Sequence, residues 1–232
     1  NPASTFYQAD ISTDGFATVN ASSLTLNASA SFSGLLVNTT HFLRVRARNA
    51  ASVFTAAVAL PDVATLANNP VAAVPSGVTT NQSTANWAAN GNPAGTRYVA
   101  QIDDDPGFGS INASSNTANA FATFTGLTPN TTYHTRVEAF NAAGTGSGVV
   151  TLASTSTLAV VPVAAAFSSV AAASLRANWT ANGNAAGTRY AVALSTGPAP
   201  DTNGFAGNQS SQTLNVSAAF SGLSANATYF AS

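Results

Sequence analysis

Apolar and polar residues alternate along most of this chain with a period of two. Between residues 24 and 32 every even position is apolar, and every odd position is Thr, Asn or Ser. Residues 43–48 repeat the pattern, with apolar side chains between Arg44, Arg46 and Arg48. A period of two is typical of β-strands that bury one face, whereas the spacing of an amphipathic helix is absent. The pattern therefore predicts short strands throughout.

Turn-forming dipeptides separate these runs. Asn-Gly occurs at residues 90–91 and 182–183, Pro-Gly at 106–107 and Pro-Asn at 129–130. Gly and Asn tolerate the backbone angles of tight turns, and Pro pre-sets one of them. Roughly seven short strands between regular turns predict an antiparallel, immunoglobulin-like sandwich of two sheets, which is an all-β fold class.

The chain also repeats itself. Residues 85–98 match residues 177–190 at an offset of 92, and residues 1–7 match residues 92–98 at an offset of 91. A second marker, Phe-Ser-Gly-Leu or Phe-Thr-Gly-Leu, ends at Leu35, Leu127 and Leu223. Self-similarity at a fixed interval predicts one structural unit per repeat.

These markers divide the chain into three repeats. The first repeat, residues 1–67, lacks its first two strands; the second, residues 68–159, is complete; the third, residues 160–232, lacks the end of strand F and strand G. Neither partial repeat is expected to fold alone, and exchanging strands between copies would duplicate the third to fifth strands. The hypothesis is that the chain is a window on a longer repetitive protein, or a filament unit whose neighbours complete the broken repeats.

Aromatic residues recur at matching places in the repeats. Trp87 and Trp179 fall on the second predicted strand, Tyr98 and Tyr190 fall on the third, and the motif Gly-Leu-x-x-Asn-x-Thr-Tyr ends at Tyr133. This combination resembles the fibronectin type III module. The resemblance implies tandem β-sandwiches in which the tyrosine of strand F bonds back to the backbone as a tyrosine corner. In the first repeat His41 stands in place of that tyrosine.

Each tryptophan is expected to anchor one core, because a buried indole contributes several kcal/mol. The predicted core comprises Trp87, Trp179, Tyr7, Tyr98, Tyr190, Leu35, Leu127, Leu223, Tyr133 and Tyr229. The composition, rich in Ala, Ser, Thr and Asn, also resembles that of very large bacterial surface and extracellular repeat proteins.

Charge and composition exclude several classes of protein. The chain has 7 basic and 8 acidic residues and a net charge of -1, which provides no basic field for nucleic acid. It has no Cys and only 2 His, so a thiolate nucleophile and a Cys-ligated metal are excluded, and we expect no cofactor. The longest apolar run, Leu158–Phe167, contains Pro162 and is too short to span a membrane.

Few residues suggest chemistry. Asp103, Asp104 and Asp105 offer oxygen ligands to calcium, but Asp before Pro-Gly is ordinary turn chemistry, which is the favoured explanation. His134 and Glu138 lie four residues apart, about 13 Å along a strand, so they cannot share a proton. A nucleophile elbow and a phosphate-binding loop are also missing, so we expect no enzyme and no metal site.

Two surface features are candidates for binding or modification. Arg44, Arg46 and Arg48 form a ladder that could meet an acidic glycan or a neighbour's carboxylates, although a solvated strand face is the favoured explanation. N-glycosylation sequons occur at Asn20, Asn27, Asn38, Asn81, Asn112, Asn130, Asn178, Asn208, Asn215 and Asn226. Of these, Asn27, Asn178 and Asn215 are expected to face outward, where glycans are accommodated.

The sequence therefore predicts a non-catalytic structural protein. We expect a segment of an extracellular or cell-surface filament, rod or adhesin stalk, in which short links join consecutive sandwiches. Its expected partners are copies of itself or further repeats of the same chain, with glycans as a second class. The alternative is a spacer or carbohydrate-binding accessory segment of a secreted polysaccharide-degrading enzyme, which requires a platform of exposed aromatic rings. Phe121 and Phe140 point outward by alternation.

Overall fold

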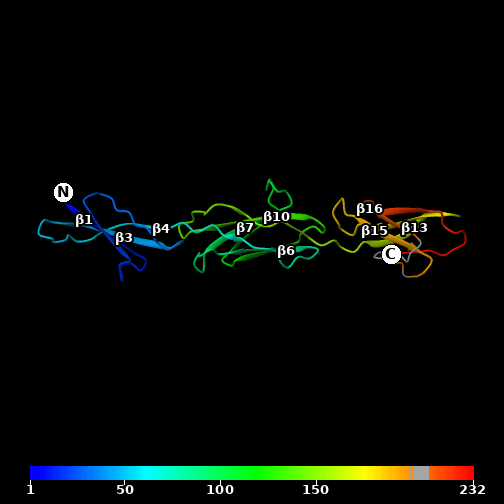
Figure 1. Ribbon diagram of the computed structural model, residues 1–232, viewed down its shortest axis with the longest axis horizontal. Helices are drawn as coiled ribbons and strands as arrows, with labels where there is room; N and C mark the ends of the chain where they lie inside the picture. Colours follow the sequence, from blue (N-terminus) through cyan, green and yellow to red (C-terminus); the bar gives the residue numbers. More distant parts are fainter. Residues whose placement is uncertain (199, 201–208) are drawn as a thin grey trace. The chain divides into compact units, whose positions relative to one another are not determined.

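A computed structural model describes residues 1–198, 200 and 209–232. Within these residues every regular element is a β-strand, and all strand pairs with an assigned register are antiparallel. Figure 1 shows strands and loops along the whole described chain. The predicted all-β fold class is confirmed.

Two compact units organise the chain. One unit consists of Asn1–Ser76, Thr84–Phe124 and Tyr133–Ser154. The other consists of Gly77–Ser83, Thr125–Thr132 and Thr155–Ser232. Contacts described below between the first and second repeats lie inside the first unit, and those between the second and third repeats lie inside the second unit.

The first repeat forms one four-stranded sheet in the order β2-β1-β3-β4. Its strands are β1 (Phe6–Ser12), β2 (Ala21–Thr25), β3 (Thr40–Arg48) and β4 (Val58–Ala64). In the pairing of β1 with β3, Asp10 stands opposite Arg44 and Phe6 stands opposite Arg48. This register brings together charged side chains that are more than thirty residues apart in sequence.

One expectation, a strand at residues 26–32, is wrong. Their alternation predicts a strand, yet β2 ends at Thr25 and no strand follows before β3. The corresponding residues of the other repeats do form strands, β9 (Phe121–Thr125) and β17 (Ser217–Ser221). Each of those strands lies beside a tryptophan-bearing strand, and this chain holds no such strand for the first repeat.

The second repeat contains two sheets. One has the order β5-β6-β9, with β5 at Val71–Ala72 and β6 at Gln82–Ala88. The other has the order β11-β10-β7-β8, with β12 also paired to β10. Its strands are β7 (Arg97–Asp103), β8 (Ala113–Thr117), β10 (Thr132–Phe140), β11 (Val150–Thr151) and β12 (Thr155–Ser156). Figure 1 draws them in green.

Alternation along these strands builds the core of the second repeat. The inward residues of β7 and β10 include Ile102, Val137 and Ala139, which are fully buried. Trp87 of β6 packs against Tyr98 of β7 with ring centroids 5.5 Å apart and planes tilted by 57°. A tilted arrangement is favourable for aromatic pairs. The two sheets therefore meet around the indole.

The third repeat has sheets in the orders β13-β14-β17 and β16-β15-β18. The remaining strands are β13 (Val163–Ala171), β14 (Ser174–Thr180), β15 (Tyr190–Ser195), β16 (Gln209–Thr213) and β18 (Phe230–Ala231). Trp179 and Tyr190 repeat the aromatic pair at 5.6 Å and 58°. Trp179, Leu223 and Tyr229 pack, partly buried, on a core that includes Leu194 and Phe220.

The other predicted core residues differ in burial. Trp87, Tyr98, Leu127, Tyr133 and Tyr190 are buried, whereas Tyr7 and Leu35 of the first repeat are only partly buried. Among the described residues no helix is long and apolar enough to cross a membrane.

Candidate functional site

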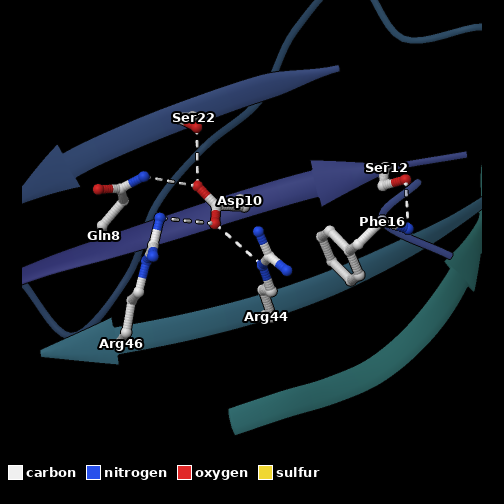
Figure 2. A network of polar contacts seen from close by, with 7 residues as sticks. All are labelled: Gln8, Asp10, Ser12, Phe16, Ser22, Arg44 and Arg46. Atoms are coloured by element: carbon white, nitrogen blue, oxygen red, sulfur yellow. Dashed lines mark hydrogen bonds and ion pairs between the residues drawn. The ribbon is translucent and has the colours of Figure 1, made fainter. Parts of the chain in front are cut away.

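The densest polar cluster of the first repeat surrounds Asp10 (Figure 2). Its carboxylate is buried and accepts hydrogen bonds from Gln8 Nε2 at 2.8 Å and Ser22 Oγ at 2.7 Å. Arg44 Nε donates to the other oxygen at 3.0 Å, and the Arg46 guanidinium lies 3.6 Å from it. Charge-assisted bonds of this kind are stronger than neutral ones.

These contacts determine the charge of Asp10. Burial by itself raises the pKa of Asp10, but hydrogen bonds from Gln8, Ser22 and Arg44, with the positive charge of Arg46, outweigh it. The pKa therefore lies below the ordinary value of 3.8. Asp10 is ionised at neutral pH and compensates part of the arginine charge.

Each arginine of the ladder also lies over an aromatic ring. The guanidinium carbon of Arg44 is 4.3 Å from the centroid of Phe16, and that of Arg46 is 4.7 Å from the centroid of Phe54. Arg48 lies 5.9 Å from the centroid of Phe6. Cation–π contacts hold the guanidinium groups in place while leaving them partly exposed.

A short turn positions Phe16. Ser12 Oγ accepts a hydrogen bond from the N–H of Phe16 at 3.0 Å (Figure 2). It also accepts one from the N–H of Asp14 at 3.2 Å. Phe16 adopts a positive φ of 71°, which is uncommon for a bulky residue. Hydrogen bonds from Thr18 and Ser12 lower the pKa of Asp14 to about 2. The turn thus aims an aromatic ring at Arg44.

The second repeat has a related but less charged arrangement. Gln101 replaces Asp10, and its Oε1 accepts a hydrogen bond from Arg136 Nε at 2.7 Å. Arg136 lies 4.1 Å from the ring of Phe108, which has a positive φ of 53° as Phe16 does. The Phe16–Arg44 pair therefore recurs at Phe108–Arg136 with a neutral partner in place of the carboxylate.

A second Phe–Arg pair joins the same strands, and its two residues are exchanged between the repeats. Phe6 on β1 faces Arg48 on β3, whereas Arg97 on β7 faces Phe140 on β10. Arg97 lies 4.0 Å from the centroid of Phe140. A Phe–Arg contact is thus present in both repeats although the two residues have exchanged strands.

Around Asp10 the first repeat has the guanidinium groups of Arg44 and Arg46 and one buried carboxylate, while Arg48 lies farther along β3, opposite Phe6. The surplus positive charge suits a carboxylate or sulfate group, since planar guanidinium groups bind such oxyanions well. Within the described residues no group of three or more His, Asp or Glu side chains is arranged to hold a metal ion.

The acidic run of the second repeat is used in a turn. Asp103 Oδ1 accepts the N–H of Asp105 at 3.2 Å, and Asp105 Oδ1 accepts the N–H of Gly107 at 2.9 Å. Ser12 and Ser195 occupy the place of Asp103 in the other repeats and accept the N–H two residues later in the same way. Asp104 donates its N–H to Asn112 Oδ1 at 2.7 Å.

The two histidines lie apart from this turn chemistry. His41 is buried, and neither ring nitrogen has a hydrogen-bond partner among the described residues. In the third repeat, by contrast, the Tyr229 hydroxyl accepts the N–H of Ser224 at 2.9 Å, as a tyrosine corner does. His134 stands opposite Asp103 in the β7–β10 pairing, and Glu138 Oε1 accepts the N–H of Gly148 at 3.1 Å.

Three sequon asparagines already use their amide nitrogen, the atom to which an N-linked glycan attaches. Asn178 Nδ2 donates to the Ala166 carbonyl at 2.7 Å, which ties β14 to β13. Asn27 and Asn215 are exposed, and only their backbone N–H groups form hydrogen bonds in the described chain. Asn178 thus differs from the other two sites expected to face outward, and Asn208 lies outside the described residues.

The other two occupied sequon amides form the contacts between repeats. Asn38 Nδ2 donates to Thr96 Oγ1 at 2.8 Å, and Asn130 Nδ2 donates to Thr188 Oγ1 at 2.8 Å. Each pair is separated by 58 residues. Both asparagines have a positive φ, 45° for Asn38 and 49° for Asn130. We call this contact the Asn–Thr junction.

The short link before each later repeat is held in the same repeated way. Asn92 Oδ1 accepts the N–H of Asn68 at 2.7 Å, and its Nδ2 donates to the Asn68 carbonyl at 2.8 Å. Asn184 makes the same two bonds, both at 2.7 Å, with the backbone of Val160. Neither the Asn–Thr junctions nor these two asparagine contacts was predicted, although the recurrence of the Asn and Thr residues at an offset of 92 was an available signal.

One repeat matches a known family of domains. Residues 70–152 match the family model of the fibronectin type III domain. No curated protein sequence matches the chain.

Several solved structures resemble the fold. A two-domain fibronectin type III segment of chicken tenascin is 19% identical, with a TM-score of 0.46 over 70% of this chain and 87% of that chain. The FN1–FN3 domains of chicken CNTN1 are 16% identical, with a TM-score of 0.30 over 97% of this chain and 81% of that chain. A fibronectin type III domain derived from human KIAA0970 protein is 19% identical, with a TM-score of 0.34 over 41% of this chain and 77% of that chain.

Proposed function

We propose that this chain is a non-catalytic structural protein, because residues 70–152 match the fibronectin type III family model and antiparallel sheets recur from repeat to repeat. It serves as a segment of an extracellular or cell-surface filament, rod or adhesin stalk. The observation that carries the proposal is the Asn–Thr junction, which recurs with the same residues and the same distance. A contact that recurs at the same interval is one that every further repeat of a longer array could form in the same way.

Extracellular placement is part of the proposal. Fibronectin type III domains are common in extracellular proteins, and a chain with neither Cys nor Met offers little to oxidation. The exposed sequon amides of Asn27 and Asn215 provide attachment sites for glycans, which would keep a surface with 6% charged residues soluble. Copies of the chain or further repeats are the partners in such an array.

Imaging tests the assembled role. Electron microscopy of the protein from its native source is expected to show filaments or stalks with a periodic repeat. A dispersed monomer that hydrolyses a substrate would count against the proposal.

The junction itself is tested in solution. Thr188→Val removes the hydroxyl that Asn130 binds and keeps the shape of the side chain. Residual dipolar couplings are expected to report one common alignment for the second and third repeats in the parent chain, and two alignments in the variant. Thr151→Val, at an exposed position on β11, is the matched control and should behave as the parent does.

The alternative is a spacer or carbohydrate-binding accessory segment of a secreted polysaccharide-degrading enzyme. It requires neighbouring aromatic rings that are free to stack on sugars. Phe121 is exposed, but Arg97 covers the ring of Phe140 at 4.0 Å. Affinity electrophoresis in polysaccharide gels decides this point: retardation that Phe121→Ala abolishes would favour the accessory module.

A further inference from the structure

Two arginines stand next to each other on one face of β3. Arg44 and Arg46 are two residues apart, and Figure 2 shows both side chains reaching toward the Asp10 carboxylate. At about 3.3 Å per residue, their backbone positions are separated by roughly 7 Å. This separation is within the Debye length of about 8 Å at physiological ionic strength, so the two charges attract an anion together. We call these two residues the β3 arginine pair.

Both guanidinium groups have donors to spare. Arg44 donates from Nε to Asp10 at 3.0 Å. The Arg46 side chain donates no hydrogen bond within the described part of the chain, because the nearest Asp10 oxygen is 3.6 Å away and its Nε is buried without a partner. A guanidinium carries several further N–H donors in one plane. The side chains are 28% and 31% exposed, so a ligand can reach them from solvent.

The β3 arginine pair is also held in place before any ligand arrives. The ring of Phe16 lies 4.3 Å from Arg44, and the ring of Phe54 lies 4.7 Å from Arg46. Side chains that are already ordered lose little conformational entropy when they bind. These contacts distinguish the pair from a solvated strand face, on which arginines sample many rotamers.

The charge around the pair is positive. Asp10 compensates one of the two guanidinium groups. The carboxylate of Asp14 is already bound by the N–H and the hydroxyl of Thr18 in its own turn. Arg48, farther along β3, adds another positive charge and lies beside Phe6 and not beside a carboxylate.

The second repeat shows that this face is directed toward solvent. Arg136 and Glu138 are the equivalents of the β3 arginine pair, and Gln101 is the equivalent of Asp10. All three are only partly buried, although both sheets of that repeat are present. One positive and one negative charge replace the pair there. The first repeat therefore carries a surplus of positive charge on a face that its counterpart also exposes.

We propose that the β3 arginine pair binds the sulfate or carboxylate groups of an acidic polysaccharide. Planar guanidinium groups bind such oxyanions through paired N–H donors, and an acidic polysaccharide repeats the oxyanion along its length. The inference adds a ligand to the proposed structural role, and neither depends on the other.

A second copy of this chain is a less suitable partner. Only 8 of its residues are acidic, and several of these are already engaged. Asp10 and Asp103 are buried, whereas Asp105 and Glu138 accept backbone N–H groups. Few carboxylates therefore remain on its surface for two neighbouring arginines.

Nuclear magnetic resonance tests the proposal on the isotope-labelled chain. The chain is titrated with dextran sulfate, with polygalacturonate and with uncharged dextran, from about 10 µM to about 1 mM. We expect at least one acidic polymer to shift the Nε–H resonances of Arg44 and Arg46, and dextran to shift neither. The responding polymer identifies sulfate or carboxylate as the preferred group. Raising the salt from about 50 mM to about 300 mM should weaken binding several-fold.

Three variants localise the binding. Arg46→Gln leaves every hydrogen bond to the Asp10 carboxylate in place and should weaken binding at least about threefold. Arg176→Gln, at an exposed position on β14, makes the same change in net charge and is the matched control, which should bind as the parent does. Asp10→Asn removes the compensating charge and should strengthen binding about threefold, which a damaged fold would not do. Thermal unfolding of each variant checks its fold.

Four results would overturn the proposal. They are no shift with either acidic polymer up to about 1 mM, equal weakening by Arg46→Gln and Arg176→Gln, weaker binding by a folded Asp10→Asn variant, and a shift of the same resonances on concentrating the chain alone. The last would assign the pair to a second copy. No variant touches the Asn–Thr junction, so failure here leaves the proposed function standing.

Discussion

The first and second repeats share a sequence pattern but differ in how much of it is buried. Leu60 on β4 and Leu152 after β11 are equivalent residues, yet Leu60 is 42% exposed and Leu152 is 5% exposed. Val45 and Val137 differ in the same direction. The second repeat has a tryptophan-bearing sheet that covers these side chains, and the first has none within this chain. Alternation thus determines which face of a strand is apolar, but that face is buried only when a second sheet packs on it.

The two repeats also differ in what stabilises their exposed face. The first repeat uses an ion pair between Asp10 and Arg44, and the second uses a neutral bond between Gln101 and Arg136. A buried ion pair gains from charge-assisted bonds but loses solvation energy. The two repeats therefore use different chemistry at equivalent positions of paired strands.

The largest effect is expected where two sheets meet. Trp87→Ala should destabilise the second repeat by about 3 to 5 kcal/mol, because it removes a buried indole and leaves a cavity. Amide hydrogen exchange of β7 and β10 measures this loss. In the same variant the β1 and β3 amides of the first repeat should keep their protection from exchange. A loss of protection in both repeats would show that the two repeats unfold together.

The leucine pair tests the comparison directly. Leu152→Ala should cost about 2 to 4 kcal/mol, the usual range for a buried leucine, and Leu60→Ala should cost less than about 1 kcal/mol. Hydrogen exchange of the strand beside each leucine, β10 and β3, gives both values. Equal costs would mean that the side chain of Leu60 is covered in solution.

The carboxylate of the first repeat predicts a dependence on pH. The pKa of Asp10 is lower in the folded protein than in the unfolded chain, so its contribution is complete above about pH 4 and disappears as the pH falls through the folded value. Asp10→Asn should cost about 1 to 2 kcal/mol at pH 7 and little at low pH, because a neutral residue still accepts a bond from Arg44.

Denaturant unfolding over a series from pH 7 down to about pH 2 measures this difference. Asp14→Asn serves as the control for the other carboxylate with a lowered pKa. The attribution to Asp10 fails if Asp10→Asn retains the full acid dependence of the parent.

The smallest effect concerns the reversed cation–π pair. Phe6→Arg and Arg48→Phe should each cost roughly 0.5 to 1 kcal/mol, since each removes one member of the contact. The double variant reproduces the order found at Arg97 and Phe140, and it should recover most of the loss. A double-mutant cycle on stability measures the coupling. Additive losses would show that the exchange between repeats is coincidental.

Much of the fold followed from local pattern. Period-two alternation, turn dipeptides and the recurring Trp and Tyr positions were enough to predict antiparallel sandwiches in tandem. The residues 26–32 were predicted wrongly, because a strand forms only when a neighbouring strand satisfies its backbone groups. Asn178 was predicted to face outward, and the structure adds that its Nδ2 donates to the Ala166 carbonyl of the adjacent strand.

The candidate site depended on distant pairings. Sequence reasoning found Arg44, Arg46 and Arg48, but it did not find Asp10 as their partner or Phe16 and Phe54 as the rings beneath them. Strand register brings Asp10 opposite Arg44, and a one-residue slip would send their side chains to other partners. No local pattern contains that information.

The order of apolar and polar residues by itself determined the strands, the repeat interval and the aromatic core positions, because each depends on residues that are close in sequence. Tertiary structure decided which leucines are buried, which carboxylate pairs with which arginine, and which threonine, 58 residues away, each junction asparagine binds. These outcomes depend on which distant segments pack together. Their packing determines how much apolar area is buried and the geometry of the long-range hydrogen bonds.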